Sequence, residues 1–295
     1  MRENGPVTSA TRQPETPAFA TPPRLIATDL DGTLLRDDKS VSPRTVAALA
    51  AAEEAGIAVF FVTGRPARWM DVVSDHVHGH GLAICGNGAA VVDLHGGPGA
   101  HRFVKVRQLA RENALDAVGL LRDAVPGTVY AIEQTYGFHQ EPAYPKLHME
   151  IPDHLLPAEE ILAADGPSAG EPVLKILAYH FDLDPDAFLS RARLAIGDRA
   201  TVTRSSPSAL LEISGPGVSK ASTLALECAE RGISHEEVVA FGDMPNDVEM
   251  LTWAGQSYAM GNAHPDVIAA ASGRTVANNE DGVAVVIERM LAARI

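Results

Sequence analysis

Acidic side chains directly follow two apolar segments that lie far apart in the chain. Asp29 and Asp31 come after residues 25–28, and Asp243 comes after residues 238–241. If both segments are parallel strands of one sheet, their carboxyl ends lie at the edge where ligands bind in open α/β sheets. Carboxylates gathered there repel one another unless a cation holds them, and hard oxygen ligands favour Mg²⁺. Because Mg²⁺ usually shares its site with substrate phosphate, the pattern predicts a phosphoryl substrate.

Residues at three further places carry groups that suit a phosphate. Gly32 would let the backbone come close to it, and Thr63, followed by Gly64, would offer a hydroxyl and an N–H. Lys220 opens a predicted helix and would reach the same phosphate as a point charge. Each feature alone is ordinary, since a Thr-Gly pair is a common turn and a lone lysine is usually solvated. Together, and in this order, they favour one active site.

The pair Asp29 and Asp31 suits two-step hydrolysis of a phosphate ester. Residues two apart in an extended segment point to the same side. One carboxylate would attack phosphorus and form an aspartyl phosphate. The other would protonate the departing alkoxide and later activate water.

The elements that must position these residues alternate between strand and helix at both ends of the folded chain. Near the N-terminus, strands are predicted at 25–28, 57–62 and 82–84, and helices at 43–55 and 66–76. Near the C-terminus, strands are predicted at 238–241 and 256–260, and helices at 219–231, 246–254, 264–271 and 282–292. This alternation predicts a doubly wound, mostly parallel α/β sheet with a Rossmann-like core.

The middle of the chain has a different pattern. A hairpin is predicted over 91–104, helices over 108–124 and 184–195, and strands over 128–133, 173–181, 201–203 and 210–213. These elements predict an α+β unit inserted into the first. We expect the core at 24–106 and 214–295 and the inserted cap at 107–213, with the hairpin open to either assignment.

Four segments resemble the motifs of the haloacid dehalogenase superfamily: DLDGTLL (29–35), VTGR (62–65), GVSK (217–220) and GDMPND (242–247). The large insertion between the second and third motifs, and the CGNGA run at 85–89, resemble the Cof-like branch of phosphatases. The resemblance implies a Mg²⁺-dependent phosphatase with a core and an inserted cap.

The resemblance also implies roles for the acidic residues. Asp29 would be the nucleophile and a Mg²⁺ ligand. Asp31 would be the general acid and base, and would bind Mg²⁺ through its backbone carbonyl. Asp243 would complete the metal site.

The same resemblance implies the phosphate contacts. Thr63 and Lys220 would hold the phosphoryl oxygens, Asn246 would touch the phosphate, and Asp247 would orient metal waters or Lys220. In this family a glycine often follows the motif lysine, whereas this chain has Ala221. The alanine makes the start of the helix less permissive but leaves the role of the lysine intact.

Several other residues are weaker candidates for substrate contact. Residues 136–142 form a polar and aromatic stretch that would serve either as a substrate lid, with His139 as a contact, or as an ordinary loop. Arg65 would either meet substrate or pair with a nearby acid. The histidines within 75–80 suit a helix C-terminus better than a metal site.

Composition excludes several classes of protein. The chain has 295 residues with 24 Lys and Arg against 38 Asp and Glu, and a net charge of −14 argues against nucleic acid as a partner.

No apolar run approaches the roughly 18 residues of a membrane span. Residues 1–23, rich in proline, predict a disordered tail without a secretory signal. Cys85 and Cys228 predict no disulfide framework, which favours a cytoplasmic protein.

The leading hypothesis is a Mg²⁺-dependent phosphatase that hydrolyses small phosphorylated metabolites, such as sugar phosphates, through an aspartyl phosphate. One alternative is a phosphomutase similar to phosphomannomutases, in which a second sugar hydroxyl outruns water. A non-enzymatic alternative is a phosphorylation-driven switch resembling a receiver domain, although such domains lack a large insertion. The sequence defines neither the individual substrate nor an oligomeric state.

Overall fold

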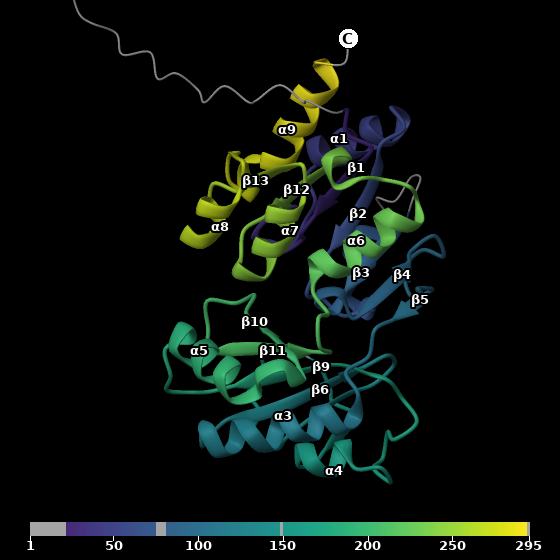
Figure 1. The fold of residues 1–295 in the computed structure, drawn as a ribbon. Coiled ribbons are helices and arrows are strands. Elements are labelled where there is room, and N and C mark those ends of the chain that lie inside the picture. Colours follow the sequence, from purple (N-terminus) through teal and green to yellow (C-terminus); the bar gives the residue numbers. More distant parts are fainter. Residues whose placement is uncertain (1–21, 75–80, 148–149, 294–295) are drawn as a thin grey trace, which may run out of the picture.

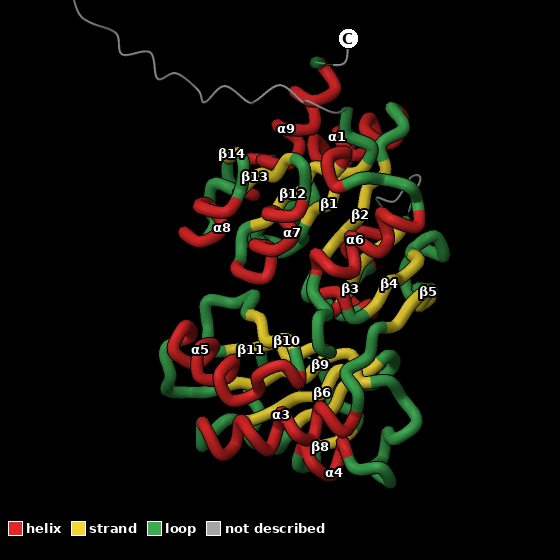
Figure 2. The backbone as a smooth tube through the Cα atoms, viewed as in Figure 1, coloured by secondary structure: helices red, strands yellow, loops and turns green. Residues whose placement is uncertain are grey.

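A computed structural model describes residues 22–74, 81–147 and 150–293 (Figure 1). The predicted tail at 1–23 lies outside these residues except for positions 22 and 23. The histidine run at 75–80 lies wholly outside them. The described chain forms two sheets, one above the other in Figure 2.

The first sheet is mostly parallel and has the strand order β14-β13-β12-β1-β2-β3-β4-β5. Its parallel strands are β1 (Leu25–Thr28), β2 (Ala58–Val62), β3 (Leu82–Cys85), β12 (Val238–Gly242), β13 (Gln256–Ala259) and β14 (Gly273–Arg274). Strands β4 (Ala90–Asp93) and β5 (Arg102–Val106) extend the sheet in antiparallel fashion, so the predicted hairpin belongs to the core.

Helices cover both faces of this sheet. They are α1 (Pro43–Glu54), α2 (Asp71–Ser74), α6 (Lys220–Glu230), α7 (Val248–Trp253), α8 (Pro265–Ala270) and α9 (Gly282–Ala292). On one face Ile26 shares a core with Leu49 of α1 and Ile287 of α9. On the other face Leu25 shares a core with Leu224 of α6. Because both faces are covered, the central strands are continuous apolar runs, which is why the sequence predicted them.

The second sheet comes from the middle of the chain and has the order β10-β11-β9-β6-β7-β8. Its strands are β6 (Val129–Gln134), β7 (Phe138–Gln140), β8 (His154–Leu155), β9 (Val173–Tyr179), β10 (Thr201–Thr203) and β11 (Leu210–Ser214). Helices α3 (Arg111–Ala124), α4 (Ala158–Leu162) and α5 (Pro185–Ile196) pack with one face of this sheet (Figure 1). The predicted doubly wound core with an inserted α+β cap is confirmed.

The cap sheet is apolar on one face and polar on the other. Tyr130 and Ile132 of β6 and Ile213 of β11 lie in the core beneath the helices. Glu133 and Glu212, on the same strands, alternate with them and line a pocket on the opposite face. The same pocket is lined by Asp29 and Asp243 at the edge of the core sheet, so this polar face of the cap is turned toward the core.

The structure differs from the predicted elements in three places. Within the described residues of the helix predicted at 66–76, the chain forms a 3-10 turn, Ala67–Trp69, before α2 begins at Asp71, whose carboxylate favours a helix N-terminus. The helix predicted at 246–254 starts as a 3-10 turn, Pro245–Asp247. The irregular stretch before residue 173 contains β7, β8 and α4, which were too short for periodicity to predict.

Two predictions from composition also bear on the fold. Cys85 and Cys228 are both buried and free. None of the helices in the described ranges is both long and apolar enough to cross a membrane.

Candidate active site

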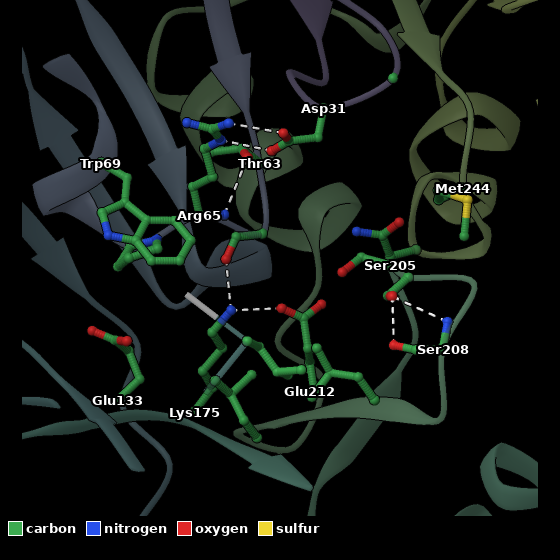
Figure 3. A pocket seen from close by; sticks show the side chains of 18 of the residues that line it. Asp31, Thr63, Arg65, Trp69, Glu133, Lys175, Ser205, Ser208, Glu212 and Met244 are labelled. Carbon is green, nitrogen blue, oxygen red and sulfur yellow. Dashed lines mark hydrogen bonds and ion pairs between the residues drawn. The ribbon is translucent and has the colours of Figure 1, made fainter. Parts of the chain in front are cut away.

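Strands β12, β1 and β2 are neighbours in the core sheet, so their carboxyl ends lie side by side. Asp29 follows β1, Thr63 follows β2, and Asp243 follows β12. All three line a pocket of about 1250 Å³ between this edge and the polar face of the cap. Figure 3 shows this pocket with Thr63 among its labelled residues. Most of the predicted site residues line it: Asp29, Asp31, Gly32, Thr63, Gly64, Arg65, Asp243 and Asn246.

Lys220 and Asp247 lie buried beneath this pocket. The Nζ atom of Lys220 is 2.6 Å from Oδ1 of Asp29 and 2.6 Å from Oδ1 of Asp247. Lys220 is the first residue of α6, and Ser219 caps that helix by accepting a hydrogen bond from the N–H of Ser222. This hydrogen bond to Ser219 fixes where α6 begins and therefore where the lysine enters the site.

Asp29, Asp243 and Asp247 form a compact cluster in which one carboxylate oxygen of each lies within 4.8 Å of those of the other two. Burial, together with repulsion from the two other acids, raises the pKa of Asp29 well above its usual value, although Lys220 opposes the rise. Burial and repulsion from Asp247 raise the pKa of Asp243 to about 7. One lysine therefore does not offset the negative charge of three buried acids, and the residues fit a divalent cation with hard oxygen ligands.

The carboxylate of Asp31 is turned away from this cluster and toward two cations. Arg65 donates to it from Nε at 2.6 Å and from a terminal nitrogen at 2.8 Å (Figure 3), and Lys39 donates at 2.9 Å. Burial raises the pKa of Asp31, but the hydrogen bonds and charge of Arg65, with Lys39, outweigh burial and lower it to about 2. Of the two alternatives for Arg65, the structure supports pairing with a nearby acid.

Gly32 is required by the geometry of the loop after β1. Its φ is +77°, in the left-handed region that favours glycine, and a Cβ there would lie 2.8 Å from Cγ of Asp243. The next residue, Thr33, donates from Oγ1 to Oδ1 of Asp243 at 2.8 Å. The first motif therefore also holds the acid of the fourth motif in place.

The loop after β2 is braced by its neighbours. The N–H of Thr63 donates to the carbonyl of Ile84 at 2.8 Å, and the N–H of Asn87 donates to the carbonyl of Thr63 at 3.0 Å. Oγ1 of Thr63 accepts from the N–H of Arg65 at 3.1 Å, which orients the hydroxyl. The carbonyl of Gly64 accepts from Lys175 of the cap at 2.6 Å.

The fourth motif is ordered by Asp247 and by an amide pair. Oδ2 of Asp247 accepts from the N–H groups of Asp243 and Met244 at 3.0 and 3.1 Å. Nδ2 of Asn246 donates to Oδ1 of Asn87 at 2.9 Å. Asn246 thus reaches the pocket with one amide hydrogen already engaged.

His139 is not brought to the pocket, in contrast to the expectation from sequence. Its side chain is buried, with Nε2 2.7 Å from Oε1 of Gln134 and its ring stacked on His154. The stretch around it is strand β7, and alternation along that strand sends Phe138 and Gln140 into the pocket instead. The sequence predicts a loop here, and a loop has no alternation of side chains that would separate Phe138 and Gln140 from His139.

The cap contributes charged residues that the sequence reasoning missed. Glu133, Lys175 and Glu212 are buried side chains that line the pocket. A signal was present, because a lysine within the apolar run Val173–Tyr179 and a glutamate within Leu210–Ser214 each interrupt a strand. Charged residues in such positions are rarely fully buried unless they are paired.

Arg68 of the core also reaches the cap across the pocket. Its guanidinium donates to Glu133 and to Glu150, and it lies 5.7 Å from the ring centre of Trp69 and 5.4 Å from that of Phe138. The outer part of the pocket therefore combines aromatic faces with paired charges.

Comparison with known proteins is consistent with this geometry. The model of the family described as haloacid dehalogenase-like hydrolase matches residues 26–287. A 5-amino-6-(5-phospho-D-ribitylamino)uracil phosphatase of Bacillus subtilis is 30% identical over 279 residues, covering 90% of this chain and 96% of that protein. A pyridoxal phosphate phosphatase of Escherichia coli is 30% identical over 275 residues, covering 88% and 96%.

Comparison with solved structures gives the same family. A haloacid dehalogenase-like hydrolase from B. subtilis superposes with a TM-score of 0.76 at 25% identity, covering 90% of this chain and 99% of that one. The resemblance seen in the four motifs is confirmed over the folded chain. This protein belongs to the haloacid dehalogenase-like hydrolases.

Proposed function

We propose that this phosphatase of the haloacid dehalogenase-like family hydrolyses small phosphorylated metabolites, with Asp29 as nucleophile and Mg²⁺ as cofactor. The observation that carries the proposal is the position of Lys220. Its ammonium lies between Asp29 and Asp247, while Asp243 stands within the same cluster at the base of the pocket. A buried nucleophile, a fixed cation and an acidic cluster are what phosphoryl transfer to a carboxylate requires.

The carboxylates of Asp29 and Asp243 and the backbone carbonyl of Asp31 would hold Mg²⁺. The bound cation would neutralise charge on the phosphoryl group and favour the ionised form of the surrounding acids. Asp247 would support the site from beneath, because its carboxylate already accepts from two backbone N–H groups of the fourth motif and from Lys220.

In the first step an oxygen of Asp29 forms a bond to phosphorus, and the bond from phosphorus to the ester oxygen breaks. Lys220 orients the Asp29 carboxylate and opposes the rise in the pKa of Asp29. The ammonium can do so because Asp247 and Asp29 raise the pKa of Lys220 despite its burial. The products of this step are an aspartyl phosphate and an alcohol. In the second step water takes the phosphoryl group and Asp29 is released.

Asp31 would give its proton to the leaving oxygen and then take one from the attacking water. Asp31 lines the same pocket as Asp29, although its carboxylate is turned toward Arg65 and Lys39. Its bonds to Arg65 and Lys39 favour the ionised form, which suits the base of the second step. Donation in the first step requires the protonated carboxyl to separate from Arg65, so a bound substrate has to compete for that guanidinium.

The phosphoryl oxygens would be held by Thr63, Gly64, Lys220 and Asn246, with Gly32 leaving room for their approach. The cap would select the leaving group. Its pocket face combines Phe138 and Leu177 with Glu133, and it suits a leaving group that has both apolar surface and hydrogen-bonding groups. Sugar phosphates, phosphorylated polyols and pyridoxal phosphate share this character, and relatives named for two of these classes support the proposal.

A substrate panel tests the proposal. The purified chain with Mg²⁺ is assayed for phosphate release from sugar phosphates, pyridoxal phosphate, 5-amino-6-(5-phospho-D-ribitylamino)uracil and phosphoglycolate. We expect release from at least one of these compounds by the wild type and none by Asp29→Asn. Equal release by Asp29→Asn, or no release from any phosphomonoester by the wild type, would overturn the proposal.

A further inference from the structure

The loop Gly86–Gly88 of the CGNGA run occupies a central position between the motifs. Asn87 has φ +56° and ψ +35°, in the left-handed region that asparagine tolerates better than most residues. Its N–H donates to the carbonyl of Thr63 at 3.0 Å. On the other side, Oγ1 of Thr223 in α6 donates to the carbonyl of Gly88 at 2.7 Å. The loop therefore connects the second motif to the helix that carries Lys220.

The side chain of Asn87 joins the cap to the fourth motif. Its Nδ2 donates to the carboxylate of Glu212, and its Oδ1 accepts from Nδ2 of Asn246 at 2.9 Å. An ionised carboxylate only accepts hydrogen bonds, so Glu212 fixes which end of the Asn87 amide faces it. That choice presents the carbonyl of Asn87 to Asn246 and fixes the second amide as well.

The orientation of Asn246 decides what it offers to a substrate. One hydrogen of its amide is donated to Asn87, and the second remains for an acceptor in the pocket. Its Oδ1 is buried and has no hydrogen-bond partner among the residues that the structure describes. A buried amide oxygen left without a partner is costly, so we infer that the bond to Asn87 holds the amide in this orientation.

The carboxylate of Glu212 also orders the second motif, through Lys175. Nζ of Lys175 lies 2.6 Å from Oε1 of Glu212 and donates to the carbonyl of Gly64 at 2.6 Å (Figure 3). The side chains of Lys175 and Glu212 are 4% and 5% exposed, so water screens the pair little. Two cap strands, β9 and β11, thus reach two separate phosphate-binding segments of the core.

We propose that Glu212, Lys175 and Asn87 are positioning residues that couple the cap to phosphate binding. When the cap is docked, Glu212 orients the amide of Asn246 through Asn87, and Lys175 holds the loop at Gly64. When the cap separates, both segments lose these bonds and hold phosphate less tightly, which favours product release. This inference rests on the proposed function, because it takes Asn246 and Gly64 to be phosphate contacts.

Glu212→Gln tests the proposal, with Glu227→Gln as its matched control. Glu227 is equally buried and lies 2.6 Å from Lys105, but it belongs to α6 and lies outside the pocket lining. A glutamine at 212 can donate as well as accept, so it no longer fixes the two amides. We expect both variants to lose thermal stability. The KM for p-nitrophenyl phosphate and the inhibition constant of inorganic phosphate should rise about tenfold in Glu212→Gln alone.

The turnover number separates positioning from a general structural effect. Loss of binding shared by substrate and transition state raises KM and leaves kcat nearly unchanged. We therefore expect the kcat of Glu212→Gln to stay within about twofold of the wild type. Equal KM and phosphate inhibition in the two variants would overturn the inference.

An exchange of groups provides a second test. In the double variant Asn87→Asp with Glu212→Gln, the amide of residue 212 can donate to the carboxylate at 87, and that carboxylate still accepts from Asn246. The hydrogen bond between residues 87 and 212 is reversed in direction, and the total charge is conserved. The orientation of Asn246 is therefore restored. Asn87→Asp alone sets two carboxylates against each other and should bind phosphate more weakly than the wild type.

We expect the double variant to bind inorganic phosphate more tightly than either single variant. A double variant that binds inorganic phosphate no more tightly than the tighter-binding single variant would contradict the relay. Wild-type protein without phosphatase activity would overturn the proposed function. An active wild type, with Glu212→Gln indistinguishable from Glu227→Gln, would overturn this inference alone.

Discussion

The ammonium of Lys220 lies 2.6 Å from Oδ1 of Asp29, although 191 positions separate the two residues in the sequence. A second bond of the same length joins it to Asp247. One buried cation is thus shared by the acid after β1 and an acid of the fourth motif. The ammonium fixes the direction of the Asp29 carboxylate before any substrate arrives.

Removing this ammonium should damage both folding and activity. Lys220→Met keeps the length of the side chain but leaves three buried acids without their cation. We expect a loss of about 3 kcal/mol of unfolding free energy in urea, measured in chelator at neutral pH. We also expect kcat/KM to fall by at least about a hundredfold.

Lys105→Met is the control, because that lysine also bonds two glutamates but is more exposed. It should cost far less stability and leave activity intact. A Lys220→Met protein as stable and active as the wild type would refute the shared-cation arrangement.

The acidic cluster predicts dependence on a metal. Chelation should abolish phosphate release, and Mg²⁺ should restore it. Ca²⁺ should restore it poorly, because it prefers more ligands and looser geometry. Asp243→Asn removes one carboxylate of the cluster and should raise the Mg²⁺ concentration needed for half-maximal activity.

Calorimetric titration of the wild type and Asp243→Asn with Mg²⁺ measures the loss of Mg²⁺ affinity directly, without substrate. Full activity after exhaustive chelation, or unchanged Mg²⁺ affinity in the variant, would speak against this assignment of the metal site.

Two neighbouring residues of β7 separate selection from stability. Phe138 points into the pocket, whereas the side chain of His139 points away and bonds Gln134. Phe138→Ala should change relative kcat/KM among phosphorylated metabolites and affect p-nitrophenyl phosphate much less. His139→Ala should lower the unfolding temperature and leave the order of substrates unchanged. If both substitutions shift the order equally, the cap face does not select the leaving group as argued.

The buried pair of Glu212 and Lys175 predicts how stability depends on pH. Burial alone would raise the pKa of Glu212, but the charge of Lys175 and hydrogen bonds from Lys175 and Asn87 outweigh burial and lower it. A carboxyl whose folded pKa is depressed contributes stability that is complete above its unfolded pKa of about 4.3. That contribution is lost as pH falls through the folded pKa.

We therefore expect Glu212→Gln to be less stable than the wild type by about 3 kcal/mol at pH 7. The gap should narrow below about pH 4, because protonated Glu212 resembles glutamine. Denaturant unfolding of both proteins between pH 7 and pH 3 measures it. A gap that is constant or widens toward low pH would contradict the lowered pKa.

The core and its acidic residues could be predicted because each signal is local. Leu25–Thr28 is apolar throughout since helices cover both sides of the sheet, and an acid directly after such a strand must lie at the sheet edge. The neighbourhood of Asp29 and Asp243 then follows from the pairing of β1 with β12.

The cap side of the site could not be predicted in the same way. Its strands have one polar face, and which residues share that face depends on exact strand limits. Placing 136–142 in a loop selected His139, whereas strand alternation selects Phe138 and Gln140. The contacts of Glu212 and Lys175 with the core also depend on how the cap docks, which no spacing in the sequence encodes.

The most direct test of the central claim is to trap the phosphoryl group on its acceptor. Asp31→Asn keeps the nucleophile but removes the group that activates water, so p-nitrophenyl phosphate, with its good leaving group, should still phosphorylate the protein. Intact-mass measurement after rapid quench should show one added phosphoryl group, and peptide mapping should place it on Asp29. A phosphoryl group on another residue, or substantial turnover by Asp29→Asn, would contradict the account.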